Sequence, residues 1–292
     1  MEIMVLAGSP LDFPSWHPDL KLNRYNRVMK WHDEYLPSLY QDKKVTHSWG
    51  SHEILSRFDP TTSLGILSCV YDVESLEEFD TLMAKNPLRD ISRFTTLPLC
   101  SLFEDQRSDY ERTERSLRHL MTDKNAVQER EIENRRALYS GPPEFVGETT
   151  LTDNPPNTPN ELSEASFPND ELRILLVACN PNNLIESWDD LRKQVLYEKV
   201  NWWFDYMALM IKDRRVSHGW GTHDFCNIEG MSVNSKGAVH VLTAKDFEDF
   251  HIFYNLDPLR EWARFHTVLL NPIGKQRKLD KLRLDSAQDF LK

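Results

Sequence analysis

The residues best suited to chemistry form one motif, His-x-Trp-Gly-x-His, which the chain contains twice. It covers residues 47–52 and again residues 218–223. An imidazole has a pKa near ~6.5 and can both accept and donate a proton at neutral pH. Large and small residues alternate in each copy as in a β-strand, which would turn Val45, His47 and Trp49 to the same face. The motif therefore predicts a pocket in which imidazoles act as acids and bases beside aromatic walls.

We extend the candidate site to the arginines and aromatic residues expected near these histidines. The candidate catalytic residues are His47, His218, His52, His223, Arg89 and Arg260. The candidate substrate-binding residues are Trp49, Trp220, Tyr25, Tyr71 and His32. Each arginine follows a Pro-Leu pair, and its guanidinium could hold a substrate carboxylate. The alternative for every one of them is structural: buried histidines bonded to carbonyls, core aromatics and helix-end ion pairs.

A metal site is the main chemical alternative. His47 and His52 would both point inward only if a bulge near Gly50 re-aimed the strand. A carboxylate such as Glu53 or Asp224 would then complete a facial triad. The four cysteines lie far apart without a C-x-x-C pair, so we expect free thiols rather than disulfides or a zinc site. Our expectation is a site with no metal and no other cofactor.

One constant offset of 171 residues relates the two motifs and many other residues. The further matches are Glu77-Glu-Phe79 with Glu248-Asp-Phe250, Asn86-Pro87-Leu88-Arg89 with Asp257-Pro258-Leu259-Arg260, Phe94 with Phe265, Ile3 with Ile174, Trp31 with Trp202, and Tyr35 with Tyr206. Chance gives one short match but not a series in register, and the period is too long for a solenoid. The chain therefore contains a duplicated domain.

Each copy predicts the same order of elements, β-α-β-β-α-β. The ranges are 2–7, 25–39, 45–57, 64–73, 75–86 and 94–103 in the first copy, and 172–178, 188–211, 215–226, 237–243, 246–256 and 264–271 in the second. This order is that of a ferredoxin-like unit, whose sheet has helices on one face only. Two such units would cover each other's bare faces. We therefore expect an α+β fold in which tandem ferredoxin-like units pair into an intramolecular dimeric α+β barrel.

Between the copies the composition changes. Residues 105–138 carry many charges of both signs and predict a long, mostly exposed helix. Residues 140–171 contain seven acidic residues, no Lys or Arg, and six of the sixteen prolines, which predicts an extended linker. The predicted organisation is barrel unit 1 over residues 1–104, the charged helix and acidic Pro-rich linker over 105–171, and barrel unit 2 over 172–292.

Composition also restricts the partners and the compartment. The formal net charge of −11 argues against a nucleic-acid partner. No apolar run approaches the ~20 residues that a membrane span needs, and the N-terminus lacks the basic region of a cleaved signal. We expect a cytoplasmic protein with a small-molecule substrate and neither nucleic acid nor membrane as partner. Self-association into a homo-oligomer stays open.

Residues 67–100, together with His47-x-Trp49, resemble muconolactone isomerase, a family of the dimeric α+β barrel superfamily. The matching features are the H-x-W strand, the junction Asp72-Val-Glu-Ser75, the Pro-Leu after the helix and the strand Pro98-Leu-Cys100. The second copy departs from this pattern, with Leu269-Leu-Asn271 in place of Pro-Leu-Cys. The resemblance implies a cofactor-free, proton-shuttling isomerisation of a lactone or unsaturated carbonyl compound, in aromatic catabolism or secondary metabolism.

Two other functions compete with this isomerase. One is an oxygenase or lyase of the same superfamily, dependent on a metal or haem or on neither. The other is a non-catalytic ligand-binding or assembly module. The chain has no G-x-G-x-x-G, P-loop, G-x-S-x-G or H-E-x-x-H motif, which removes the standard nucleotide-binding, hydrolase and zinc-protease interpretations.

Overall fold

The computed structural model describes residues 1–10, 12–56, 62–101, 171–179, 215–222, 237–260 and 263–291, with single residues between 195 and 213. The predicted helix 105–138 and all of the acidic linker except Glu171 lie outside the described residues. In the part of the chain that is described, no helix combines the length and apolar character needed to cross a membrane.

The described elements follow the predicted order in both halves of the chain. The strands are β1 (Glu2–Pro10), β2 (Val45–Ser56), β3 (Thr62–Asp72), β4 (Arg93–Pro98), β5 (Cys100–Ser101), β6 (Leu172–Cys179), β7 (Val216–Thr222), β8 (Gly237–Ala244) and β9 (Arg264–Pro272). The helices are η1 (Phe13–Ser15), α1 (Pro18–Lys30), η2 (Trp31–Tyr35), α2 (Leu36–Gln41), α3 (Leu76–Ala84), α8 (Phe247–Leu256) and α9 (Ile273–Phe290). The described residues of the predicted helix 188–211 are also helical. The sequence analysis did not predict α9.

Matching caps begin the equivalent helices of the two halves. Ser75, the predicted N-cap, accepts a hydrogen bond from the Glu78 amide at the start of α3. Asp246 accepts one from the Asp249 amide at the start of α8 in the same way. Acidic residues in the first turn of each helix favour its positive end.

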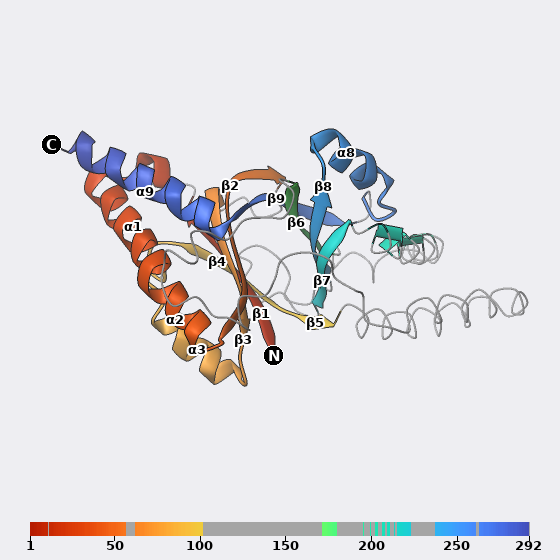
Figure 1. The fold of residues 1–292 in the computed structure, drawn as a ribbon, viewed down its shortest axis with the longest axis horizontal. Coiled ribbons are helices and arrows are strands. Elements are labelled where there is room, and N and C mark those ends of the chain that lie inside the picture. The colour runs from red at the N-terminus through yellow and green to blue at the C-terminus, as the bar shows by residue number, and fades with distance from the viewer. Residues whose placement is uncertain are drawn as a thin grey trace, which may run out of the picture.

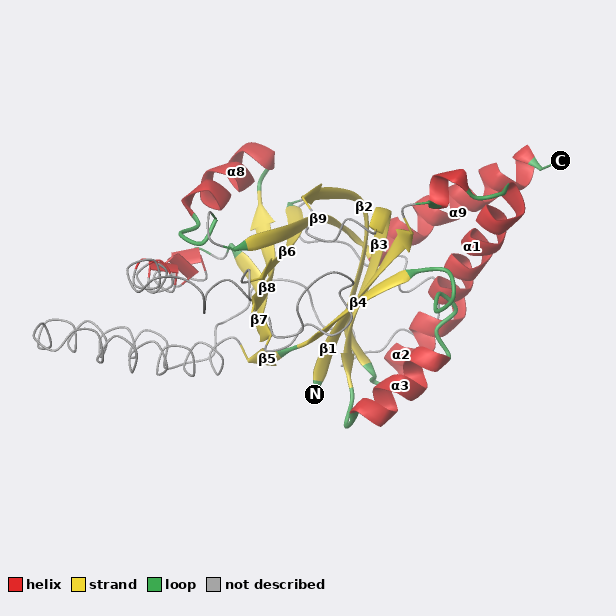
Figure 2. Cartoon of the chain, turned by 180° about the vertical axis from the view of Figure 1, so that it is seen from behind, coloured by secondary structure: helices red, strands yellow, loops and turns green. Residues whose placement is uncertain are grey.

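All the strands in the described part of the chain form one antiparallel sheet, and its two halves share one strand order. The first half contributes β4-β1-β3-β2 and the second contributes β9-β6-β8-β7, followed by the short β5. The fold is thus α+β with an antiparallel sheet. The strands lie at the centre of the molecule, with α1, α2, α3 and α9 on one outer side and α8 on the other (Figures 1 and 2).

The halves meet at two seams with equivalent registers. At the β2–β9 seam, Trp49 is opposite Pro272 and Gly50 is opposite Asn271. At the β5–β7 seam, Ser101 is opposite Trp220 and Cys100 is opposite Gly221. These pairs are related by the same sequence offset of 171 residues. β4 and β5 stand at the two ends of the strand order, and only Leu99 separates them along the chain. The end of the order therefore leads back to its beginning.

A β-bulge near the start of β2 changes which residues share a face. The pairing with β3 passes from Val45 opposite Tyr71 to His47 opposite Val70, so that Thr46 is an extra residue. Val45 consequently packs under the helices, and the expectation that it shares a face with His47 was wrong. The equivalent bulge occurs in β7, between Val216 and His218. The predicted irregularity near Gly50 occurs only in the pairing of β2 with β9, where the register shifts after Gly50.

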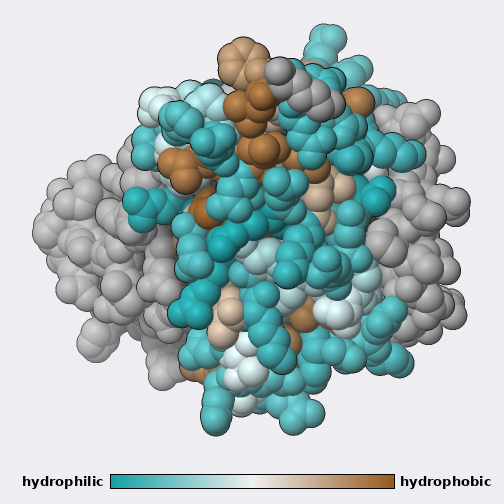
Figure 3. Space-filling view, turned by 90° about the vertical axis from the view of Figure 1, so that its left-hand side faces the viewer, coloured by the Kyte–Doolittle hydropathy of each residue, from teal (hydrophilic) through white to brown (hydrophobic). Residues whose placement is uncertain are grey.

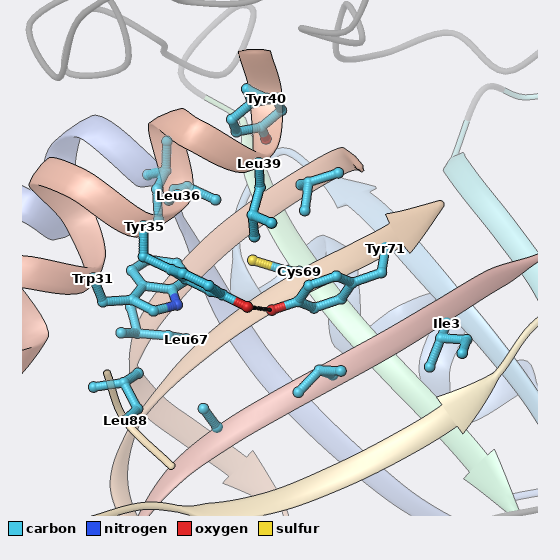
Figure 4. Packing of buried hydrophobic residues seen from close by; sticks show 14 of the residues in the cluster. Ile3, Trp31, Tyr35, Leu36, Leu39, Tyr40, Leu67, Cys69, Tyr71 and Leu88 are labelled. Atoms are coloured by element: carbon cyan, nitrogen blue, oxygen red, sulfur yellow. Dashed lines mark hydrogen bonds between the residues drawn. The ribbon is translucent and has the colours of Figure 1, made fainter. Parts of the chain in front are cut away.

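Three apolar clusters stabilise this arrangement. Two lie between the sheet and the helices, one in each half, and the first includes Leu36, Cys69 and Tyr71 (Figure 4). The third lies between the inner faces of the two half-sheets and draws residues from both. Its members are Met4, Leu6, Trp49, Ile66, Val70, Leu97, Leu99, Leu175, Val177, Trp220, Val239, Val241, Val268 and Leu270. Burial of this inner cluster joins the halves into one structure.

The C-terminal helix α9 extends from the second half across the helices of the first. It lies beside α1 (Figure 1), and two of its residues bind the π-helical turn η2. Asp280 contacts His32 Nε2 at 3.1 Å in a buried pair, and Arg277 donates to Asp33 at 2.7 Å. The outer face of this helix layer is mainly hydrophilic, with apolar side chains gathered near one end (Figure 3).

Gly50 allows α9 to approach β2 closely. A Cβ at this position would overlap the side-chain carbons of the buried Gln276. Gln276 in turn donates to Asp280 at 3.1 Å and accepts from Asn271 at 3.2 Å, so it has little freedom to move away. The glycine is therefore needed for the contact between the halves, beyond any role in the motif.

We predict that Gly50→Ala destabilises the protein by about 2 kcal/mol, the usual cost of overpacking a closed contact. Denaturant unfolding of the purified variant measures this cost. In a Gln276→Ala background the same substitution should cost less, because two of the three overlapping carbons are gone. An equal cost in both backgrounds would contradict the assigned contact.

Candidate functional site

The two motifs meet inside the sheet and place four rings in contact. The ring centroids of His47 and His218 are 4.4 Å apart, with an interplanar angle of 74°. His47 stacks on Trp49 at 5.5 Å and His218 stacks on Trp220 at 5.7 Å. The cross contacts, His47 with Trp220 and Trp49 with His218, are both 5.9 Å. We call these residues the four-ring cluster. The prediction that each first histidine shares a face with its tryptophan is thus confirmed.

The bulges hold these histidines through the residues that they insert. The Thr46 hydroxyl donates a hydrogen bond to the Val70 carbonyl at 3.4 Å. His47 Nδ1 lies 3.0 Å from the hydroxyl oxygen of Thr46. Because that hydroxyl proton is already directed at a carbonyl, the Thr46 oxygen accepts from the imidazole Nδ1–H. The geometry therefore assigns the proton of His47 to Nδ1 and leaves Nε2 as an acceptor.

The second half repeats this arrangement. Ser217 donates to the Val241 carbonyl at 3.1 Å, and His218 Nδ1 lies 3.2 Å from the Ser217 oxygen. His47 and His218 are only 8% and 7% exposed. The Nε2 atom of His47 is buried and has no hydrogen-bond partner among the residues that the structure describes. Buried acceptors without a partner are rare, because burying an acceptor without a hydrogen bond costs about 1–3 kcal/mol.

Burial keeps both imidazoles neutral at physiological pH. It lowers the pKa of His47 to about 4. It also lowers the pKa of His218 to about 3, an effect to which the neighbouring His47 and the positive charge of Arg173 add. The pair therefore offers neutral hydrogen-bonding groups at pH 7, whereas an imidazolium acid would require a much higher pKa.

Two charged residues that the sequence analysis missed lie on the inner face near the cluster. Trp220 donates its indole N–H to Glu2 at 3.1 Å, and burial raises the pKa of the Glu2 carboxyl despite this bond. Arg173 is 3% exposed, donates to the Thr243 hydroxyl and lies 3.8 Å from Glu171. The offset of 171 residues pairs Glu2 with Arg173, so the repeat itself contained the signal.

The other sequence-predicted residues lie away from the four-ring cluster or outside the description. Arg89 and Arg260 are exposed in the turns that follow α3 and α8, and the Arg260 guanidinium lies 5.5 Å from the Tyr254 ring. The side chain of His52 and the whole of His223 lie outside the described residues. Of the candidate catalytic residues whose side chains the structure describes, it brings together His47 and His218.

Three candidate substrate-binding residues lie on the helix side of the sheet. Tyr71 belongs to the outer apolar cluster, with its hydroxyl 3.4 Å from that of Tyr35 (Figure 4). His32 is the partner of Asp280 beneath α9. Tyr25 lines a surface groove of about 490 Å³ between α1 and α9. Because the sheet separates these residues from the four-ring cluster, they do not share its site.

Within the described residues there is no group of three or more His, Cys, Asp or Glu side chains that could hold a metal ion. The facial triad considered for His47 also needs His52 and either Glu53 or Asp224. The side chains of these three lie outside the described residues, so that alternative is untested.

Comparisons with known proteins give no family for the chain. No protein-family model and no curated protein matches it, so the resemblance to muconolactone isomerase has no support at the sequence level. A variant of chlorite dismutase from Candidatus Nitrospira defluvii is similar in structure, with a TM-score of 0.46 and 9% identity, over 96% of this chain and 94% of that one. A putative chlorite dismutase, TA0507, has a TM-score of 0.41 and 11% identity, over 95% and 98%. These neighbours belong to the dimeric α+β barrel superfamily, but similarities this low carry no argument about activity.

The lowered histidine pKa values predict acid sensitivity. The unfolded chain binds protons at both histidines below pH ~6.5, whereas the folded protein does so only near pH 4 and pH 3. Their contribution to stability is therefore complete above pH ~6.5 and is lost as the pH falls towards 4. Between pH 7 and pH 5 we expect each histidine to lose about 2 kcal/mol of its contribution to the free energy of unfolding, or about 4 kcal/mol for the pair.

The matched control is the double variant His47→Phe/His218→Phe, measured by denaturant unfolding at each pH. It removes the two histidines but keeps Glu2 and Asp257, whose raised pKa values act in the opposite direction. At each pH, the free energy of unfolding of the wild type minus that of the double variant gives the contribution of the two histidines. Parallel pH profiles of the two proteins would show that the histidines do not titrate as assigned.

Proposed function

We propose that this chain binds a small molecule that donates a hydrogen bond to His47 at the four-ring cluster. The observation that carries the proposal is the buried Nε2 acceptor of His47, which has no partner among the described residues. A ligand hydroxyl would satisfy this atom and remove the cost of its burial. Each tryptophan already stacks on one imidazole. A planar ligand suits such a cluster, because its ring would extend this stacking of flat rings.

We also propose that the two halves are tandem ferredoxin-like units that form one intramolecular barrel. Their equal strand order and the equal registers of the two seams support this arrangement. The site then lies on the pseudo-twofold axis, where His47 and His218 face each other. A ligand bound there would contact both halves at once.

Proton transfer is the second candidate function, in line with the isomerase that the sequence resembles. The paired imidazoles favour it, because both are in the neutral, basic form at pH 7. A base with a pKa of about 4 removes protons from carbon slowly, since the driving force for transfer is small. Ligand binding is therefore the function that the geometry supports better.

The binding proposal predicts a preference for phenol over anisole, which has the same ring but no hydroxyl proton. We expect phenol to bind the wild type about three- to tenfold more tightly, the value of one hydrogen bond between neutral groups. In His47→Phe the two probes should bind equally. Titration followed by the histidine Cε1–H NMR signals gives the dissociation constants and reports directly on the His218 ring.

His251→Phe is the matched control, because it makes the same substitution at an exposed position on α8. It should retain the preference for phenol. Equal binding of phenol and anisole to the wild type, or an unchanged preference in His47→Phe, would count against the assigned contact. If neither probe shifts the NMR signal of His218, the result would count against a site at the cluster.

The proton-transfer candidate makes its own prediction about pH. If His47 is the base, kcat/KM for deuterium exchange into a β,γ-unsaturated ketone such as 3-cyclohexenone should be constant from pH 6 to pH 8. It should fall below about pH 5, where the imidazole begins to bind a proton. An inflection near pH 6.5, or activity retained in His47→Phe, would exclude this residue as the base.

A further inference from the structure

The duplicated sequence places opposite charges at equivalent positions beside the four-ring cluster. The offset that relates His47 to His218 also relates Glu2 to Arg173. In each strand the next residue packs under the helices, and the one after it belongs to the inner cluster. Glu2 and Arg173 therefore lie on the inner face. A site that is nearly symmetric in its rings is therefore unsymmetric in its charge.

Strand directions place these charges at the same end of the sheet. Successive antiparallel pairings connect β1 to β3, β3 to β2, β2 to β9 and β9 to β6. Four reversals restore the direction, so β1 and β6 run the same way, and Glu2 and Arg173 both lie at the beginning of their strands. Glu2 is half-buried and its neighbour Met1 is exposed, so the beginning of β1 is in contact with solvent.

Arg173 lies close to the second histidine. His218 is opposite Val241, which is opposite Leu175, and Arg173 is the next residue of β6 on that face. The positive charge of Arg173 also contributes to the lowered pKa of His218, which requires proximity. A guanidinium is well shaped to bind a carboxylate through two parallel hydrogen bonds. Arg173 is 3% exposed and lies 3.8 Å from Glu171, so its guanidinium is held at a fixed place beside the four-ring cluster.

We propose that the ligand of this site is a hydroxylated aromatic or conjugated carboxylate, bound with its carboxylate at Arg173 and its hydroxyl at His47 Nε2. The inference rests on the proposed function, since it names the chemical class of the molecule at the four-ring cluster. Glu2 fixes the orientation, because a carboxylate turned the other way would meet another carboxylate next to Trp220. The structure thus assigns one binding direction to a site built from two similar halves.

The experiment compares 4-hydroxybenzoate and 3-hydroxybenzoate with phenol on the full-length chain, by the same NMR titration. We expect at least one hydroxybenzoate to bind the wild type about tenfold more tightly than phenol, because its carboxylate adds a charge-assisted contact. In Arg173→Gln this advantage should disappear while the affinity for phenol is retained. Arg173→Lys should keep part of it, because the charge remains but the paired geometry is lost.

Arg27→Gln serves as the control, since it removes a surface arginine of α1 that pairs with Asp90. It should leave the advantage of the carboxylate unchanged. If Arg173→Gln does not fold, the decrease in Arg173→Lys alone decides the question, and an unchanged advantage in that variant overturns the assignment.

The two proposals fail in different ways. If phenol binds with the expected preference over anisole but neither hydroxybenzoate binds more tightly, the assignment of Arg173 is wrong and the proposed function stands. The same holds if Arg173→Gln retains the advantage of the carboxylate. If none of the probes shifts the His218 signal, both proposals are overturned.

Discussion

A four-stranded antiparallel sheet with helices on one face must bury its other face, and this constraint explains most of the structure. In this chain the inner face of each half covers that of the other, and residues from both form a single apolar cluster. Both edges of each half are also paired, because the β2–β9 and β5–β7 seams connect the half-sheets. The four-ring cluster lies where these inner faces meet, so the contact that joins the halves also builds the candidate site.

Polar groups make this interior more than a hydrophobic core. The bulges at Thr46 and Ser217 each add one residue, which turns a histidine inward and supplies the hydroxyl that fixes its tautomer. Burial then holds both imidazoles in the neutral form. The same local irregularity thus decides where each histidine points, which nitrogen carries its proton and which charge state it adopts.

The sequence predicted the repeat, the order of the elements and the shared face of His47 and Trp49, because a constant offset and the periodicity of residue types can both be read directly from the residues. It could not predict that Val45 turns outward, since a bulge inverts the alternation without changing the residue pattern. It also missed α9, which exposes two large apolar residues, Leu282 and Phe290, that weaken the amphipathic pattern. Tyr71 was expected in the pocket, but a residue's face follows from the register, which the sequence alone does not give.

The two seams connect halves of a single chain, and this has an evolutionary consequence. In a homodimer each substitution appears twice, on both sides of the symmetry axis, so a favourable change at one position is tied to its effect at the other. A single chain with two copies is free of that restriction, and each half can acquire residues that its counterpart would not tolerate. Covalent connection thus allows an interior built from two similar halves to evolve two different ends.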